Sequence, residues 1–158
     1  MKELLRNRWV RVGLLTTTLF AINVIARVVV WKAAPKSATT QDRIGIISLV
    51  AIAVVMILAG FWWSRRCPIP RVVADLGLAG IVACLLVVLV GPFTGGSRPF
   101  KEGAGFFFHE IWVFMGLVIG GAFFGFLVAT AFGLDWKSRQ YKRHAEYLKS
   151  KPTRPIRR

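Results

Sequence analysis

Residues 44–63 read IGIISLVAIAVVMILAGFWW, a run of 20 residues that contains no charged side chain. A helix of that length rises about 30 Å, which matches the thickness of the hydrocarbon core of a bilayer. A buried helix of a soluble domain is usually shorter and carries a polar stripe along one face. This run therefore predicts a helix that crosses a membrane, and it decides the fold class.

Three further apolar stretches share this pattern. We place the spans at residues 12–31, 44–63, 72–90 and 106–134. Together they hold three of the 29 charged residues of the chain, namely Arg27, Asp75 and Glu110. The fourth stretch is longer than a bilayer requires, so it can tilt or begin in the interface. The sequence thus predicts an all-α integral membrane protein, with a four-helix transmembrane domain over residues 1–134 and a tail over residues 135–158.

The first stretch has a second interpretation. Four basic residues precede it, as in a secretory signal peptide. The apolar run nevertheless continues past Arg27 to Trp31, and its Ala-x-Ala-like cleavage sites are poor. We expect a retained first span, and a cleaved signal peptide is the alternative.

The charge of the chain indicates its topology. A formal net charge of +15 and 55% hydrophobic residues conflict in a single soluble domain, but here charge and apolarity are segregated along the chain. Sixteen of the 22 basic residues lie before the first span, in the 64–71 loop or after Leu134. Because Arg and Lys gather in cytoplasmic loops, both termini are predicted to be cytoplasmic, in a multi-pass protein of the bacterial inner membrane. No nucleic-acid partner is predicted.

The tail from Asp135 to Arg158 carries a net charge of +7. Each cation close to an anionic leaflet contributes about 1 kcal/mol to surface binding. We therefore predict that the tail binds the anionic lipid surface. Residues 137–151 lack Gly and Pro and are expected to continue the fourth helix. The residues predicted to face the lipids are Lys137, Arg139, Lys142, Arg143, Lys149 and Lys151.

Polar residues inside the first and fourth spans point to a contact between them. Thr16, Asn23 and Arg27 fall within about 40° of one another on a helix, and such a polar face must meet protein, water or the interface. His109 and Glu110 lie at about the depth of Arg27. We predict an Arg27–Glu110 ion pair, and we expect His109 and Glu110 to face neighbouring helices.

Asp75 lies one turn inside the third span. It follows Arg71 by four positions, which favours a local ion pair at the interface. The alternative is a carboxylate that binds a proton or cation, because an ionisable residue within a membrane is a functional candidate by default.

Small residues recur at four-residue spacing in the fourth span. The two series are Gly121, Gly125, Ala129 and Gly133, and Gly116 and Gly120. In lipid, small residues allow two helix backbones to approach closely. The pattern predicts a helix-packing interface with a partner subunit or a second copy. Packing inside the protein's own bundle is an equally weighted alternative.

Sequence motifs of catalysis or metal binding are missing. The Gly-rich segment 91–105 lacks the ending of a phosphate-binding loop and is predicted to be a flexible hairpin. HExxH, CxxC and GxSxG do not occur. Cys67 and Cys84 would lie about 25 Å apart on a helix and are read as free thiols. We predict no catalytic residue, metal or cofactor.

These features favour a non-catalytic accessory or assembly subunit of a larger membrane complex. Its expected partners are the bilayer, with its anionic lipids, and another membrane protein or a second copy. The alternative is a small oligomeric transporter or channel coupled to ions or protons. That alternative would use Asp75, Glu110 and His109.

Overall fold

The computed structural model describes residues 7–33, 38–94 and 103–150, and every regular element in them is helical. The elements are α1 (Arg8–Ala33), α2 (Ala38–Arg66), α3 (Ile69–Leu85), η2 (Leu86–Val90), α4 (Gly91–Thr94), α5 (Ala104–Ala131) and α6 (Trp136–Ser150). Within the described residues, four helices are long and apolar enough to cross a membrane. The prediction of an all-α, multi-pass membrane protein is thereby confirmed.

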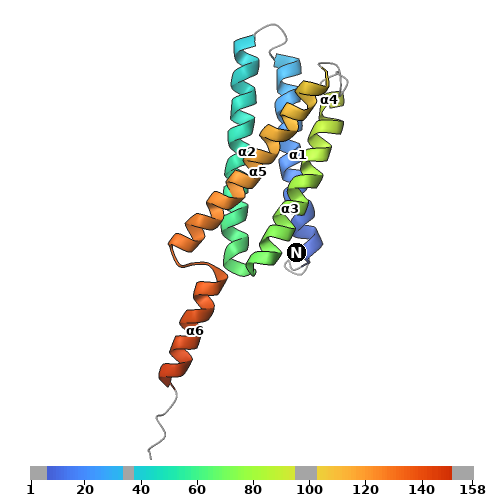
Figure 1. Ribbon diagram of the computed structural model, residues 1–158. Helices are drawn as coiled ribbons and strands as arrows, with labels where there is room; N and C mark the ends of the chain where they lie inside the picture. Colours follow the sequence, from blue (N-terminus) through green and yellow to red (C-terminus); the bar gives the residue numbers. More distant parts are fainter. Residues whose placement is uncertain (1–6, 34–37, 95–102, 151–158) are drawn as a thin grey trace, which may run out of the picture.

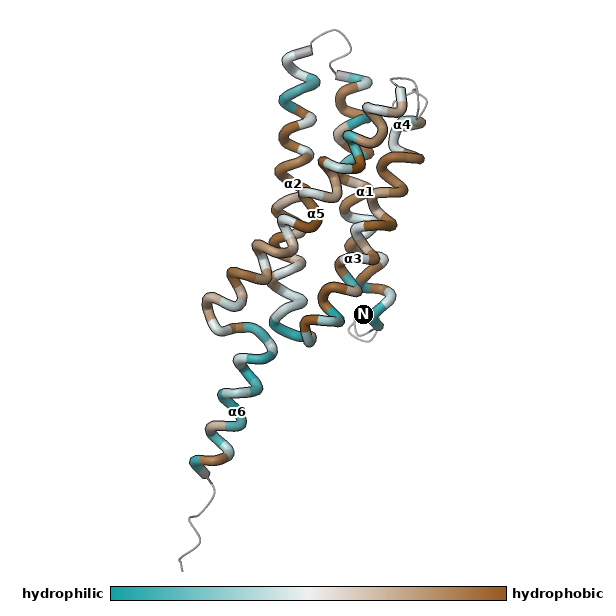
Figure 2. The backbone as a smooth tube through the Cα atoms, viewed as in Figure 1, coloured by the Kyte–Doolittle hydropathy of each residue, from teal (hydrophilic) through white to brown (hydrophobic). Residues whose placement is uncertain are grey.

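The four spans run side by side and alternate in direction (Figure 1). We call the end of the bundle that holds Arg8, Ile69 and Ala131 the proximal end, and the other the distal end. Helix α6 leaves the proximal end and extends away from the bundle. Figure 2 shows that hydrophobic residues dominate the spans and hydrophilic residues dominate α6. Apolarity and charge are therefore separated in space as well as along the chain.

The third span is longer than predicted, because α3, η2 and α4 follow one another without a break from Ile69 to Thr94. Pro92 has no N–H with which to bond the Val88 carbonyl four residues earlier. The chain adopts a π-helical turn directly before it, in which the Gly91 N–H donates to the Leu86 carbonyl. The predicted hairpin is therefore wrong for Gly91–Thr94, which are helical, and for Ala104 and Gly105, which begin α5. Residues 95–102 of that predicted hairpin lie outside the described residues.

The fourth span does not continue into the tail, contrary to the prediction. Gly133 has a φ of +59°, which only glycine adopts without strain. The Leu134 N–H donates to the Ala129 carbonyl at 2.9 Å, and the Gly133 N–H donates to the Thr130 carbonyl at 2.9 Å. This is a Schellman ending of a helix. Gly133 therefore terminates α5. The prediction that it belongs to the packing series is wrong, because it lies beyond the last residue of α5 and, among the described residues, a Cβ there would meet only Lys142 Nζ of α6 within 4 Å.

Helix α6 begins anew after that turn. The Asp135 carboxylate accepts a hydrogen bond from the Ser138 backbone N–H at 3.2 Å, which caps the first turn of α6. The tail helix is thus a separate element, joined to the bundle by a short turn.

Helices α2 and α5 touch through their backbones. A Cβ atom placed on Gly125 would lie 2.1 Å from the Ile57 carbonyl oxygen, and one on Gly60 would lie 2.3 Å from the Ala122 carbonyl oxygen. Gly121 is nearly as close, because its Cβ would lie 2.9 Å from Met56 Cβ. Glycine is required on both helices, since any side chain at these positions would meet backbone or buried atoms.

Helix α1 packs on α3 through apolar residues and one polar contact. Leu19 and Ala79 are completely buried. The Thr16 hydroxyl lies 3.0 Å from the Val12 carbonyl oxygen and 3.4 Å from the Ala79 carbonyl oxygen of α3. The hydroxyl group is thus satisfied inside the bundle, as a polar group in lipid must be.

Candidate functional site

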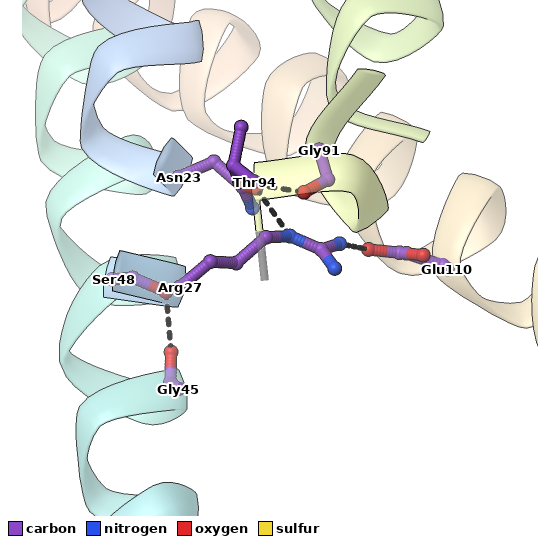
Figure 3. Close-up of polar contacts among 7 residues, drawn as sticks. All are labelled: Asn23, Arg27, Gly45, Ser48, Gly91, Thr94 and Glu110. Carbon is purple, nitrogen blue, oxygen red and sulfur yellow. Dashed lines mark hydrogen bonds and ion pairs between the residues drawn. The ribbon is translucent and has the colours of Figure 1, made fainter. Parts of the chain in front are cut away.

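Arg27 and Glu110 form an ion pair at the distal end of the bundle (Figure 3). The Arg27 guanidinium joins α1 to the carboxylate of Glu110 on α5. Its Nε–H also donates to Asn23 Oδ1 at 2.8 Å, one turn earlier on α1. The Arg27 and Glu110 side chains are 26% and 25% exposed. The predicted pair is therefore present, and Asn23 orients the arginine.

Gly91 completes this distal cluster. A Cβ on Gly91 would lie 3.1 Å from Arg27 Nε and 3.4 Å from Asn23 Oδ1. The π-helical turn before Pro92 brings this glycine to the polar atoms, and the Thr94 hydroxyl donates to the Gly91 carbonyl at 2.6 Å (Figure 3). Sequence reasoning missed Gly91. The Gly-Pro pair at the end of the span was the available signal.

Asp75 forms the second ion pair, at the proximal end. Its carboxylate accepts from Arg8 Nε at 2.6 Å and from Trp63 Nε1 at 3.4 Å. The Asp75 side chain is 4% exposed and that of Arg8 is 45% exposed. The predicted partner, Arg71, is wrong, because Asp75 points into the bundle while Arg71 is exposed. Helix α1 begins four residues before the predicted span, and this extension carries Arg8 to Asp75.

One helix, α1, supplies the arginine of both pairs. Arg8 and Arg27 are separated by 19 positions, or about 28 Å along a helix axis. That separation is close to the thickness of the hydrocarbon core. The two pairs therefore tie α1 to α3 at one end of the bundle and to α5 at the other. Each carboxylate already has a cationic partner, which suits a structural tie.

The small residues of α5 divide between two faces. Gly121, Gly125 and Ala129 are buried, and the two glycines contact α2. Gly116 and Gly120 are exposed, and a Cβ on either would meet nothing within 4 Å. The first series is thus used inside the bundle, and the second is open to the surroundings.

Two aromatic residues and a histidine accompany the open glycines. His109, Trp112 and Phe123 are all exposed, and they fall within about 80° of Gly116 and Gly120 on a helix. We call these five residues the outward face of α5. The expectation that His109 faces a neighbouring helix is wrong within this chain, because its position on α5 turns it away from α1, α2 and α3.

The remaining predicted residues lie apart from these clusters. Cys67 and Cys84 are buried free thiols. On α6, Lys137, Lys142, Arg143 and Lys149 are exposed and Arg139 is partly buried, while Lys151 lies outside the described residues. Among the residues that the structure describes, no group of three or more His, Cys, Asp or Glu could hold a metal ion.

Comparison of the chain with protein-family models, with curated proteins and with solved structures gives no match. The two ion pairs and the outward face of α5 are therefore the features from which a function can be inferred.

Proposed function

We propose that this chain is a non-catalytic accessory or assembly subunit of a larger complex in the bacterial inner membrane. The observation that carries the proposal is the division of the α5 glycines. Gly121 and Gly125 are used by the protein's own α2, whereas Gly116 and Gly120 have open space at their Cβ positions. A second close-packing surface on the same helix is available to another protein.

The outward face of α5 suits a transmembrane helix as its partner. In lipid, helices associate through van der Waals contact and polar contacts, since acyl chains are as apolar as leucine. The two glycines let a partner backbone approach. Trp112 lies about one turn before them and Phe123 about one turn after them along α5, and both provide large apolar surfaces. Trp112 is 78% exposed, so this area is free in the isolated chain. His109 adds a polar group at the distal end.

Two further features support a scaffolding role. The Arg8–Asp75 and Arg27–Glu110 pairs fix α1 against its neighbours and present α5 on a defined bundle. The basic residues of α6 lie beyond the proximal end, where they would meet the anionic cytoplasmic leaflet if both termini are cytoplasmic. The tail would then hold the subunit at a fixed depth.

Native co-purification tests the proposal. The full chain is extracted from its own membrane in mild detergent, purified and sized, with its partners identified by mass spectrometry. We expect a stoichiometric, unrelated membrane protein that is lost in the Gly116→Leu, Gly120→Leu double variant. Gly13→Leu is the matched control, since Gly13 is exposed on α1 and its Cβ would also meet nothing within 4 Å. A pure homo-oligomer, or a partner retained equally by the double variant, would contradict the proposal.

The deep burial of Asp75 favours a second candidate, a small oligomeric transporter or channel coupled to ions or protons. Such a protein would have to release Asp75 from Arg8, or Glu110 from Arg27, in each cycle. Flux into proteoliposomes that disappears in Asp75→Asn or Glu110→Gln would establish this candidate. The accessory-subunit proposal predicts no flux from the purified wild-type chain.

A further inference from the structure

Helices α3 and α5 enclose an apolar groove on the proximal half of the bundle. The groove has a volume of about 380 Å³ and is lined from α3 by residues such as Val73 and Gly77 and from α5 by residues such as Ile119 and Phe126. At its distal limit the two helices touch, because a Cβ on Gly80 would lie 2.6 Å from Val118 Cγ1. Below this contact they diverge toward the proximal end (Figure 1).

The depth of the groove matches one leaflet. From Gly77 to Ile69 the α3 wall covers eight positions, or about 12 Å along a helix axis. Half of a hydrocarbon core is about 15 Å. A helix of another protein would run through both leaflets and would meet the closed Gly80–Val118 contact. An acyl chain reaches only to the middle of the bilayer, so its length suits a groove that ends at the Gly80–Val118 contact.

A second pocket lies next to the groove at the proximal end. This pocket has a volume of about 310 Å³. One wall is formed by Pro68, which precedes α3, and by Pro70 in the first turn of α3; the other wall is formed by Trp136, Lys137 and Tyr141 of α6. Ile69 lines both cavities, so the two adjoin at this residue. All residues that line the α3–α5 groove are apolar, whereas the second pocket contains the cation of Lys137, the phenol of Tyr141 and the amide of Gln140. Among the residues that the structure describes, no acidic residue lines either one.

We propose that these two adjoining cavities together bind one phospholipid with an anionic headgroup. One acyl chain lies in the α3–α5 groove, and the phosphate lies beside Lys137 and Tyr141 at the mouth. Because bulk acyl chains are as apolar as the groove, the groove alone gives no preference for one lipid over another. The preference comes from Lys137, the cation that lines the second pocket. The groove borders the outward face of α5, because Phe123 lines the groove, whereas Gly116 and Gly120 do not line it.

Lipid binding to the purified full-length chain tests the proposal. Lipid-depleted protein in a neutral detergent is titrated with dioleoyl phosphatidylglycerol or dioleoyl phosphatidylcholine, and native mass spectrometry measures the first binding event. We expect the anionic lipid to bind about fivefold more tightly, the preference expected for one cation near an anionic headgroup. Lys137→Gln should remove that preference, whereas Lys149→Gln should keep it. Lys149 is a matched control because it is an exposed cation further along α6, and its loss changes net charge equally.

A second variant tests the acyl-chain part. A Cβ on Gly77 would meet nothing within 4 Å, and Gly77 lines the groove, so Gly77→Phe places a ring inside it. Gly77→Phe should weaken the first binding event for both lipids. Gly13→Phe, at an exposed position on α1, should not. Circular dichroism and monomer size verify the fold of each variant. The proposal would be overturned if Lys137→Gln and Lys149→Gln reduced the preference for the anionic lipid equally, or if Gly77→Phe bound both lipids as the wild type does. It would also be overturned if a second copy or another protein occupied the groove.

Discussion

The α2–α5 contact and the contacts of α1 hold the same bundle together by different means. At α2–α5, glycines on both helices bring backbone atoms together, as at Gly60 and Gly125. Helix α1 instead carries an arginine near each end, and each arginine pairs with a carboxylate on another helix. One contact depends on the absence of side chains, and the other depends on charged side chains.

This difference follows from the solvent. Lipid provides little hydrophobic drive for helices to associate, so a contact needs either close packing or polar partners. Close packing tolerates no added atom, whereas an ion pair inside a membrane tolerates no missing partner. The two kinds of contact should therefore respond to opposite kinds of substitution.

The largest effect is expected from adding a side chain to the α2 side of the glycine contact. In Gly60→Leu, the new Cβ would lie 2.3 Å from the Ala122 carbonyl oxygen, and the helices must separate. We expect a loss of roughly 3 kcal/mol in the free energy of unfolding, measured by titration of mixed micelles with a denaturing detergent. Gly45→Leu on the same helix, where a Cβ meets nothing within 4 Å, is the control. Equal losses in both variants would show that close packing at Gly60 is not the cause.

A smaller effect is expected from removing one partner of the distal ion pair. Arg27→Met and Glu110→Met each leave a charge without its counterion, and since both side chains are about one quarter exposed we expect each to cost roughly 1–3 kcal/mol. The double variant should cost less than the sum of the two, because it leaves no unpaired charge. The same unfolding titration measures all three. Strict additivity would mean that the pair is not coupled.

The smallest effect is expected at the turn between α5 and α6. Gly133→Ala places a Cβ on a residue with a φ of +59°, at a cost of about 1 kcal/mol, and Asp135→Ala removes the α6 cap at a similar cost. Hydrogen exchange should show α6 amides losing protection while the spans keep theirs. Loss of protection in α2 or α5 would instead mean that the turn supports the bundle itself.

The spans could be predicted from the length of the apolar runs, and the Arg27–Glu110 pair from the depth of each residue within its span. Twenty apolar residues define a span, and helical register places two charges at one depth. The partner of Asp75 could not be found in this way, because Arg8 lies before the predicted apolar run and enters the bundle only through the extension of α1.

The faces of α5 were ambiguous for a related reason. Both glycine pairs are compatible with close packing, and only the complementary surface of α2, with Gly60, decides which pair turns inward. Gly133 was counted with the packing series because its spacing fits. The signal that it ends a helix was the aspartate two positions later, which caps the next helix.

The most direct test of the account compares the minimal change, glycine to alanine, at two positions of one helix. A Cβ on Gly125 would lie 2.1 Å from the Ile57 carbonyl oxygen, whereas one on Gly120 would meet nothing within 4 Å. The free energy of unfolding in mixed micelles should fall by about 2 kcal/mol in Gly125→Ala. It should change by less than about 0.5 kcal/mol in Gly120→Ala. Equal effects at the two positions, or a larger effect at Gly120, would contradict the assignment of the inward and outward faces of α5.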